Sequence, residues 1–244
     1  MMCRASILFV NALVLLGPGR AVAQRLPSGD AVLHRFEETF ADVRDFTVTV
    51  SAAIDMERIR VPKMEATVYF KKPDKFHVVS SGFMMLPREG MALDPALLRA
   101  RYRADVQALD TVDGRAAYRL ELTAKSPAGG MNEFRLWIDR VTWTPLRMDA
   151  NPYEGRSLSM RFEYALVEGR IWLPVVIRAN FDVRDTRADR PGVPDATGQE
   201  YQEPPRAAPR AGSMTIRYSE YRLNTGLSDD IFKKAEESPP KQKP

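Results

Sequence analysis

The chain has 244 residues and a formal net charge of +4, which is enough length for one large domain or two small ones. Its single cysteine is Cys3, so the rest of the sequence cannot form a disulfide, a thiolate metal site or a cysteine nucleophile. Basic and acidic residues alternate along the chain without a basic block, which argues against nucleic-acid binding.

Residues 1–23 have the pattern of a signal peptide that is cleaved on export. Arg4 supplies the positive start, residues 7–16 the apolar core, and residues 21–23 an A-x-A cleavage site. A short membrane anchor is the alternative, but the apolar run is well below the roughly 20 residues that span a bilayer. Cys3 precedes the apolar core, whereas a lipidated cysteine would follow it. We therefore expect an exported, periplasmic protein without a transmembrane segment.

An amphipathic helix is predicted over residues 30–43. Phe36 and Phe40 recur at helical spacing, and Ser28 or Asp30 can cap the first turn. From residue 46 the period changes to two, and apolar residues alternate with polar ones through a series of strands. The predicted strands are residues 46–56, 64–70, 76–80, 106–112, 118–122, 134–138, 146–149, 158–166, 171–183 and 214–218.

Two segments depart from this alternation. Residues 81–103 contain three methionines, two prolines and two glycines, which predicts a loop followed by a short helix over residues 94–102. Residues 184–212 are rich in proline, arginine, aspartate and glycine, which predicts a long mobile loop within one domain. We expect the folded domain to span residues 24–232 and residues 233–244 to form a disordered tail.

These elements predict a mainly β (α+β) protein built on a single antiparallel sheet. Nearly every strand is apolar on one face only, so the sheet presents a broad apolar surface that two short helices cannot cover. Such a sheet must close into a barrel, fold into a sandwich, or curl over a cavity that something else fills. The consecutive hairpins and long alternations favour a curled sheet.

No pattern in the sequence indicates catalysis or a bound cofactor. His34 and His77 are isolated, and the sequence lacks metal-binding spacings, glycine-rich phosphate loops and serine-nucleophile motifs. Glu121, Asp139 and Glu163 lie on the polar faces of strands among arginines, where cross-strand ion pairs are their expected use. We therefore expect neither enzymatic activity nor a metal or cofactor site.

Four segments recur in the order and spacing of a known superfamily. They are D-F-T-V-T-V at 45–50, E-A-T-V-Y-F-K-K-P-D-K-F at 65–76, L-W-I-D-R-V-T-W-T-P-L-R-M at 136–148 and I-R-Y-S-E-Y-R-L-N-T-G-L-S-D-D-I-F at 216–232. Together they resemble the LolA/LolB/RseB superfamily of periplasmic lipoprotein-binding proteins, in particular the outer-membrane lipoprotein-sorting (LolA-like) branch. The resemblance implies an unclosed antiparallel half-barrel. Its concave apolar face, capped by a short helical lid, holds lipoprotein acyl chains in transit between membranes.

The resemblance also implies a site at the turn after residues 66–70. In the carrier family an arginine precedes the proline of this turn and helps hold the lid shut, and an aromatic residue after it lines the mouth. The matching residues here are Lys72, Pro73 and Phe76. Because lysine lacks the planar fork of donors that arginine offers, we expect a weaker latch or none.

Residues 82–102 form a second departure, because the carrier family usually continues there with a D-G-x-x-L-W-x-Y strand. The methionines of this segment either repack around variable apolar ligands or simply fill gaps in the core. The candidate residues for the lining and rim of the cavity come from the first helix, the strands beside the turn, and this segment. They are Phe36, Phe40, Val68, Phe70, Lys72, Phe76, Met84, Met85, Leu86, Leu97 and Leu98.

Two functions fit this resemblance. The leading hypothesis is a periplasmic carrier that shelters lipid or lipoprotein acyl chains and exchanges them with inner- or outer-membrane transfer proteins. The alternative is a regulatory protein on the same fold that senses lipid or lipoprotein and binds a protein partner. Sensor members of the superfamily usually carry a second C-terminal domain, whereas a short tail follows Phe232 here, which disfavours the alternative. A secreted hydrolase would need a nucleophile that the sequence does not show.

Overall fold

The computed structural model describes residues 25–56, 59–60, 62–80, 95–126, 131–151, 156–183 and 211–236. The predictions for residues 1–23, for Met84, Met85 and Leu86, and for most of the 184–212 loop and the 233–244 tail lie outside these residues. In the part of the chain that is described, no helix is both long enough and apolar enough to cross a membrane.

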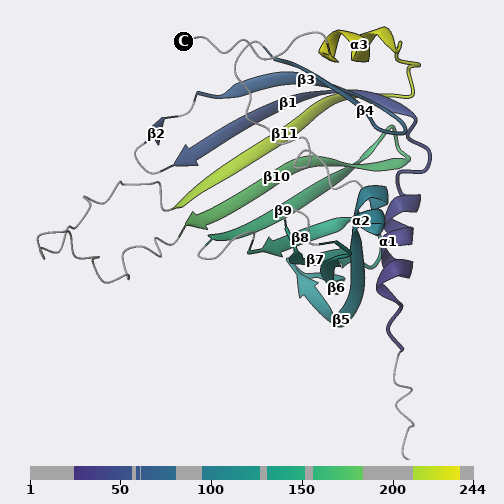
Figure 1. The fold of residues 1–244 in the computed structure, drawn as a ribbon, viewed down its shortest axis with the longest axis vertical. Coiled ribbons are helices and arrows are strands. Elements are labelled where there is room, and N and C mark those ends of the chain that lie inside the picture. Colours follow the sequence, from purple (N-terminus) through teal and green to yellow (C-terminus); the bar gives the residue numbers. More distant parts are fainter. Residues whose placement is uncertain are drawn as a thin grey trace, which may run out of the picture.

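A single antiparallel sheet forms the body of the protein (Figure 1). Its 11 strands are β1 (Asp45–Met56), β2 (Ile59–Arg60), β3 (Met64–Lys71), β4 (Lys75–Ser80), β5 (Tyr102–Val112), β6 (Arg115–Ala124), β7 (Glu133–Asp139), β8 (Pro145–Ala150), β9 (Arg156–Val167), β10 (Ile171–Val183) and β11 (Ala211–Leu223). The order is β4-β3-β1-β11-β10-β9-β8-β7-β6-β5, and β2 pairs with β1. No pairing among the described strands joins β4 to β5, so the sheet curls into a half-barrel without closing, as predicted.

The first long strand pairs with the last one. β1 lies between β3 and β11, and its pairing with β11 runs from Phe46 opposite Leu223 to Met56 opposite Gly212. From β5 to β11 every strand lies beside its neighbours in sequence, as consecutive hairpins require. The β1–β11 pairing therefore joins the beginning of the described fold to its end.

Helix α1 (Gly29–Glu38) begins as predicted and ends earlier. Ser28 is its N-cap, and the Ser28 hydroxyl accepts a hydrogen bond from the Ala31 amide at 3.2 Å. At the other end, the Thr39 amide and hydroxyl both donate to the Phe36 carbonyl, at 3.1 and 2.7 Å. These contacts tighten the last turn and end the helix before its predicted boundary.

Helix α2 (Pro95–Arg101) leads directly into β5. The sequence prediction placed the start of this strand at residue 106, but the strand begins at Tyr102. The Tyr102 hydroxyl donates to the Met131 carbonyl at 2.9 Å, and its ring lies edge-on to Phe134 at 5.0 Å. These contacts across the sheet extend β5 to the end of the helix.

Helix α3 (Asp230–Glu236) was not predicted as a helix. It occupies the end of the closing segment and the first residues of the predicted tail, so the tail prediction is corrected for residues 233–236. Phe232 is buried and anchors the helix, and the Ser228 hydroxyl accepts from the Asp230 amide at 3.3 Å. The predicted 184–212 loop is likewise shortened, because β11 begins at Ala211.

The core lies between the concave face of the sheet and helix α1. Val32, Leu33 and Phe36 of α1 are at most 1% exposed. They pack with Leu98 of α2 against the inner side chains of the sheet, which are Val48, Val50, Ala52, Val68, Leu120, Leu122, Phe134, Leu136, Ile138, Met148, Ala150, Met160, Phe162, Ile177, Ala179, Ile216 and Tyr218. Beside this core, inner-face side chains such as Met64 remain partly exposed. The helices therefore cover the concave face incompletely.

The convex face carries charges that pair with one another. Arg147, Arg161 and Arg178 lie side by side across β8, β9 and β10. Each contacts a carboxylate, and the respective partners are Asp149, Asp113 and Glu163. The Arg147 guanidinium also lies over the ring of Trp137, 4.8 Å from its centre. This face is therefore a solvated, internally balanced surface.

Two of the three predicted cross-strand ion pairs are confirmed. Glu163 pairs with Arg178, and the buried carboxylate of Asp139 contacts Arg115 at 2.9 Å. Glu121 differs, because a hydrogen bond with the neighbouring Glu133 raises the pKa of its carboxyl. Although Arg135 lies opposite Glu121 in the sheet register, the second carboxyl outweighs its attraction.

Helix α1 docks on the edge strand β5 at Gly29, where there is no room for a side chain. A β-carbon at this position would lie 2.0 Å from the Ala104 carbonyl oxygen and 2.8 Å from the Asp105 amide nitrogen. Both atoms belong to the backbone of β5, which cannot move aside like the end of a flexible side chain. The helix therefore rests directly on the strand backbone.

Gly29→Ala is expected to lower the free energy of unfolding by about 1–3 kcal/mol, because α1 must move away from β5 to admit the methyl group. Urea denaturation of the protein measures the change. Helix propensity alone predicts a gain in stability for the same substitution. A stabilised variant would therefore contradict the close packing of α1 on β5.

Candidate functional site

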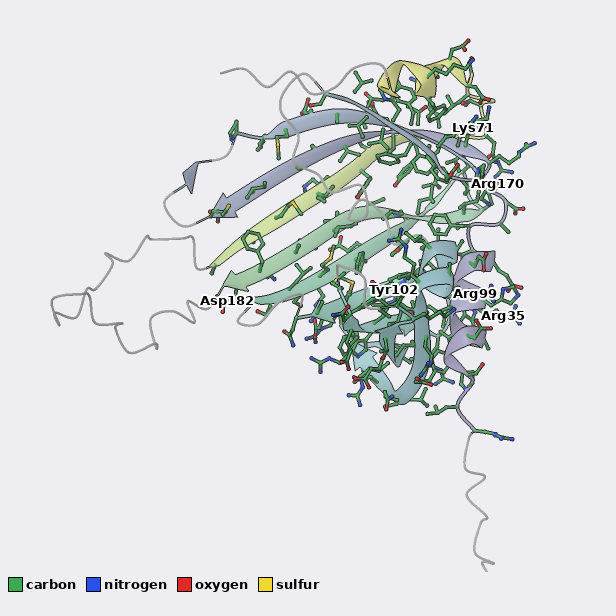
Figure 2. The ribbon with its side chains drawn as sticks, viewed as in Figure 1. Arg35, Lys71, Arg99, Tyr102, Arg170 and Asp182 are labelled. Atoms are coloured by element: carbon green, nitrogen blue, oxygen red, sulfur yellow. The ribbon has the colours of Figure 1, made fainter. Side chains whose placement is uncertain are left out.

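The candidate site lies where α1, the β3–β4 turn and the start of α3 meet, at one end of the half-barrel. Lys71, Arg35 and Arg99 mark this end in Figure 2, and Asp182 marks the opposite end of the strands. The concave face of the sheet opens beside these elements. The residues predicted from the sequence belong to two groups there: an aromatic cluster, and the lysines of the β3–β4 turn around Lys72.

The first group is an aromatic cluster on the concave side. Phe70 and Phe76 lie opposite each other on β3 and β4, and Phe70 stacks on Phe46 of β1 with ring centres 5.1 Å apart. Phe40 lies edge-on to Phe36 at 5.9 Å and packs against the same small core as Phe46 and Phe70. The structure thus brings four predicted residues together. Phe46 was missed, although its alternation with the core residues of β1 placed it on the same face.

The predicted residues differ in accessibility. Phe36, Val68 and Leu98 are 0%, 1% and 7% exposed, so their side chains hold the fold together and do not face an open space. The side chains that remain partly exposed and could contact a ligand are Phe40, Phe70, Phe76 and Leu97. The remaining candidates, Met84, Met85 and Leu86, lie outside the described residues.

Lys72 ties the β3–β4 turn to the end of α1. Its Nζ donates hydrogen bonds to the carbonyls of Phe40, at 2.7 Å, and Ala41, at 3.0 Å, in the turn that follows the helix. A single ammonium group can serve both acceptors because they are successive carbonyls on one turn. Lys72 thus holds the chain just after α1. That a lysine makes a weaker lid latch than the family arginine, or none, stays a prediction.

The neighbouring lysines hold the segment that leads into α3. Asp229 accepts from Lys71 Nζ at 2.5 Å and from Lys75 Nζ at 2.7 Å, and Lys71 also donates to the Leu227 carbonyl at 2.8 Å. The β3–β4 hairpin thus contacts both α1 and the C-terminal segment. Hydrogen bonds from Lys71 and Lys75 lower the pKa of the Asp229 carboxyl to about 2.

The attachment of α3 is expected to weaken in acid. Since the pKa of Asp229 falls from 3.8 to about 2 on folding, its contribution to stability is complete above pH 4 and is lost as the pH falls toward 2. Asp229→Asn should therefore be less stable than the wild type at pH 7 in urea denaturation, and most of the difference should be lost by pH 2. A difference of equal size at both pH values would show that the lysine contacts do not form in solution.

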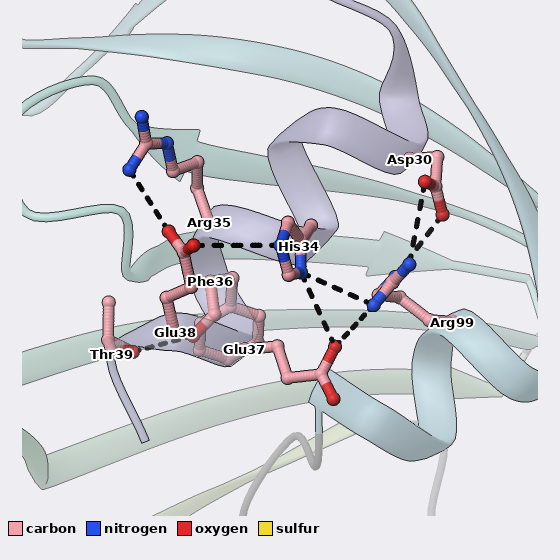
Figure 3. Close-up of polar contacts among 8 residues, drawn as sticks. All are labelled: Asp30, His34, Arg35, Phe36, Glu37, Glu38, Thr39 and Arg99. Atoms are coloured by element: carbon pink, nitrogen blue, oxygen red, sulfur yellow. Dashed lines mark hydrogen bonds and ion pairs between the residues drawn. The ribbon is translucent and has the colours of Figure 1, made fainter. Parts of the chain in front are cut away.

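A second polar network joins α1 to α2 (Figure 3). Arg99 of α2 contacts the carboxylates of Glu37, at 2.5 Å, and Asp30, at 3.2 Å, which lie about two turns apart on α1. Hydrogen bonds with Glu37, which has the larger effect, and with Asp30 raise the pKa of the Arg99 guanidinium. Arg99 also lies 3.4 Å from His34 Nδ1, which can accept from it when the ring is neutral. This network lies mostly in solvent and was not predicted from the sequence.

Two surface grooves lie away from the concave face. One of about 520 Å³, at the opposite ends of β9, β10 and β11, has a mostly small and polar lining that includes Ser157, Ser159, Asn180, Asp182 and Ser213. The other, of about 320 Å³, lies on the outer side of α1 beside Trp143. The first has Phe181 as its only large apolar lining residue among the described residues, and the second is smaller and bordered by Arg35 and Glu38.

Neither histidine takes part in a metal site among the residues that are described. No group of three or more potential ligands occurs in them. His34 lies beside Arg99, and His77 stacks on Tyr69 with ring centres 6.1 Å apart. The concave apolar face, bordered by the aromatic cluster and Lys72, is the candidate ligand surface.

No protein-family model matches the sequence, and no curated protein matches it. Solved structures match it over nearly their whole length. A LolA superfamily protein from Nitrosomonas europaea is 14% identical with a TM-score of 0.58, covering 85% of this chain and 98% of that one. A domain assigned as an outer membrane lipoprotein-sorting protein from Vibrio parahaemolyticus is 14% identical with a TM-score of 0.59, covering 84% and 97%. A DUF1329 family protein from Desulfovibrio piger is 17% identical with a TM-score of 0.59, covering 85% and 98%.

Proposed function

We propose, from the LolA-like half-barrel fold that the chain shares with these structures, that the protein is a periplasmic carrier of lipid or lipoprotein acyl chains. The observation that supports this most directly is the incompletely covered concave face, where Met64, Phe76 and Met214 pack against the core and stay partly exposed. Each methylene group buried on such a surface contributes about 0.8 kcal/mol. Two or three acyl chains would therefore bind tightly without covalent chemistry.

Helix α1 is unsuited to be the part that opens for cargo. Moving it away would expose Val32, Leu33 and Phe36, which are now 0–1% exposed. At about 1.5–3 kcal/mol for each side chain, the cost is on the order of 5–9 kcal/mol. That cost is comparable to the whole stability of many domains. We therefore propose that α1 stays in place, held at its end by Lys72.

Helix α2 is better suited to move. Its buried residues are Pro95 and Leu98, and the Arg99 ion pairs that join it to α1 are partly exposed. Exposed ion pairs contribute about 0.2–1 kcal/mol each, so thermal motion can break them. In our proposal the α2 side of the mouth opens to load and release cargo, and Arg99 controls how often it does so.

Arg99→Ala is expected to speed the release of a bound fluorescent fatty acid severalfold. The free energy of unfolding should change by less than about 1 kcal/mol, because partly exposed ion pairs contribute little to stability. Stopped-flow release measured at low and high salt checks this. Added salt should accelerate release from the wild type and have little effect on the variant. Equal release rates for the two proteins would exclude α2 as the moving part.

Mass spectrometry of lipids that co-purify with the mature protein tests the proposed function. We expect acyl lipids in a fixed ratio to protein and their displacement by a fluorescent fatty-acid probe. A protein that emerges empty and binds no probe would contradict the carrier function. If that protein instead captured a protein partner, the regulatory alternative would be the better account.

A further inference from the structure

Three tyrosines place hydroxyl groups among the apolar side chains of the concave side. Tyr164 of β9 shares a face with the core residues Met160 and Phe162, and Tyr218 and Tyr221 of β11 pack on the same core. Burial raises the pKa of all three phenols, and the nearby Tyr218 raises that of Tyr164 further. At neutral pH each is an uncharged group that can donate one hydrogen bond.

The residue paired with Tyr164 across the sheet has no free backbone group. Pro174 is the residue opposite Tyr164 in the β9–β10 pairing, and proline has no amide hydrogen. The Pro174 carbonyl is already engaged, because the Tyr221 hydroxyl donates to it at 2.7 Å. Tyr221 is therefore satisfied within the fold.

The Tyr164 hydroxyl forms no hydrogen bond with any residue that the structure describes, and burial is the main influence on it. Yet none of the described side-chain polar atoms is both sealed from solvent and without a partner. The residue as a whole is only partly exposed. The hydroxyl therefore keeps some exposure to solvent, on the face of β9 that it shares with Met160 and Phe162. An apolar ligand that excludes water from this position would leave the hydroxyl unpaired at a cost in free energy, and a ligand with an acceptor there would avoid that cost.

We propose that Tyr164 donates a hydrogen bond to the ester or amide carbonyl at the head of a bound acyl chain. The assignment rests on the proposed carrier function and names its cargo class: acyl chains, preferred over alkyl chains of the same length. The carbonyl is the polar group joined directly to the apolar tail, so it enters the apolar surface with the chain. An uncharged donor matches an uncharged carbonyl without leaving an unbalanced charge in the interior.

The test compares two lipids that differ in this carbonyl. Dioctanoylglycerol has ester-linked chains, and dioctylglycerol has ether-linked chains of equal length. Displacement of a fluorescent fatty-acid probe from the mature wild-type protein should show about 3- to 10-fold tighter binding of the ester, the effect of one hydrogen bond. Tyr164→Phe should bind the two lipids with equal affinity. Tyr221→Phe, which loses a hydroxyl already used by Pro174, should keep the preference for the ester.

Each outcome separates the assignment from the carrier function. Binding of neither lipid by the wild type would contradict the carrier function itself. Equal binding of both by the wild type, or a preference that survives in Tyr164→Phe, would overturn the role of Tyr164 and leave the carrier function standing. In the empty protein, Tyr164→Phe should unfold at the same or a higher urea concentration, because its hydroxyl has no partner in the fold. A lower midpoint would indicate a structural role for the hydroxyl and overturn the assignment.

Discussion

Replacing Phe36 with alanine is expected to lower the free energy of unfolding by about 3–5 kcal/mol. The Phe36 side chain is 0% exposed, belongs to the main core and contacts Phe40 edge-on at 5.9 Å. Its removal leaves a cavity between α1 and a sheet whose strand pairing limits relaxation, so the lost contacts are replaced only in part. Urea denaturation of the protein measures the loss.

Phe76→Ala is the matched control for Phe36→Ala. Phe76 packs against the same core but stays partly exposed, so its truncation should cost less stability and should weaken binding of a fatty-acid probe more directly. Phe36→Ala should thus be the less stable variant, and Phe76→Ala should be the variant that binds the probe more weakly. A loss below about 1 kcal/mol for Phe36→Ala would mean that α1 detaches easily, contrary to its proposed role as the fixed side of the mouth.

Asp45→Ala is expected to cost about 3 kcal/mol, because it removes charge-assisted hydrogen bonds that join the two ends of the fold. The Asp45 carboxylate is 4% exposed and accepts from the amides of Thr225, at 2.8 Å, and Gly226, at 3.1 Å. Asn224 adds a parallel contact, since its side-chain oxygen accepts from the Arg44 amide at 2.7 Å. These bonds fix the chain after β11 to the first residues of β1.

Chemical denaturation and hydrogen exchange measure the effect of Asp45→Ala. Exchange should increase most in α3 and at the end of β11, which the carboxylate holds in place. Asp45→Asn keeps one acceptor oxygen and should lose about half as much stability. Equal losses for the two variants would show that the carboxylate charge, more than its geometry, secures the contact.

The strands were predictable because their alternation reflects a single buried face. Apolar residues on β1, such as Val48, Val50 and Ala52, are buried as expected, and the same holds along β6 and β7. The alternation also indicated more apolar surface than the helices could cover, which led to the curled, unclosed sheet that is now confirmed. The pairing of the strands was harder to predict from the sequence, because β1 pairs with β11, which lies near the other end of the chain.

Element boundaries failed where local contacts overrode the pattern. The hydroxyl of Thr39 ends α1 early, and α3 forms because buried Phe232 anchors a short charged segment. β5 begins at Tyr102, directly after a helix. Between Tyr102 and Val106 the only apolar residue is the small Ala104, so the alternation that marks a strand is weak there. Each of these outcomes depends on individual side-chain contacts that sequence periodicity does not encode.

The candidate site was predicted in part. The resemblance identified Phe76 and Lys72, but it could not show that Lys72 would bond to backbone carbonyls of the turn after α1. Arg99 and Asp229 carried no signal, because each is one charged residue among many and its partners are distant in the sequence. The solved structures with TM-scores near 0.6 support the fold that the resemblance implied.

The most direct test of the central claim is photo-crosslinking with a fatty acid that carries a diazirine near the end of its chain. Peptide mapping by mass spectrometry should locate the labels on the concave face, on Met64, Phe76 or Met214, which pack there and stay partly exposed. Excess unlabelled lipid should abolish the labelling. Labels confined to the convex face around Arg147 and Arg161, or labelling that excess lipid does not reduce, would contradict an acyl-chain site inside the half-barrel.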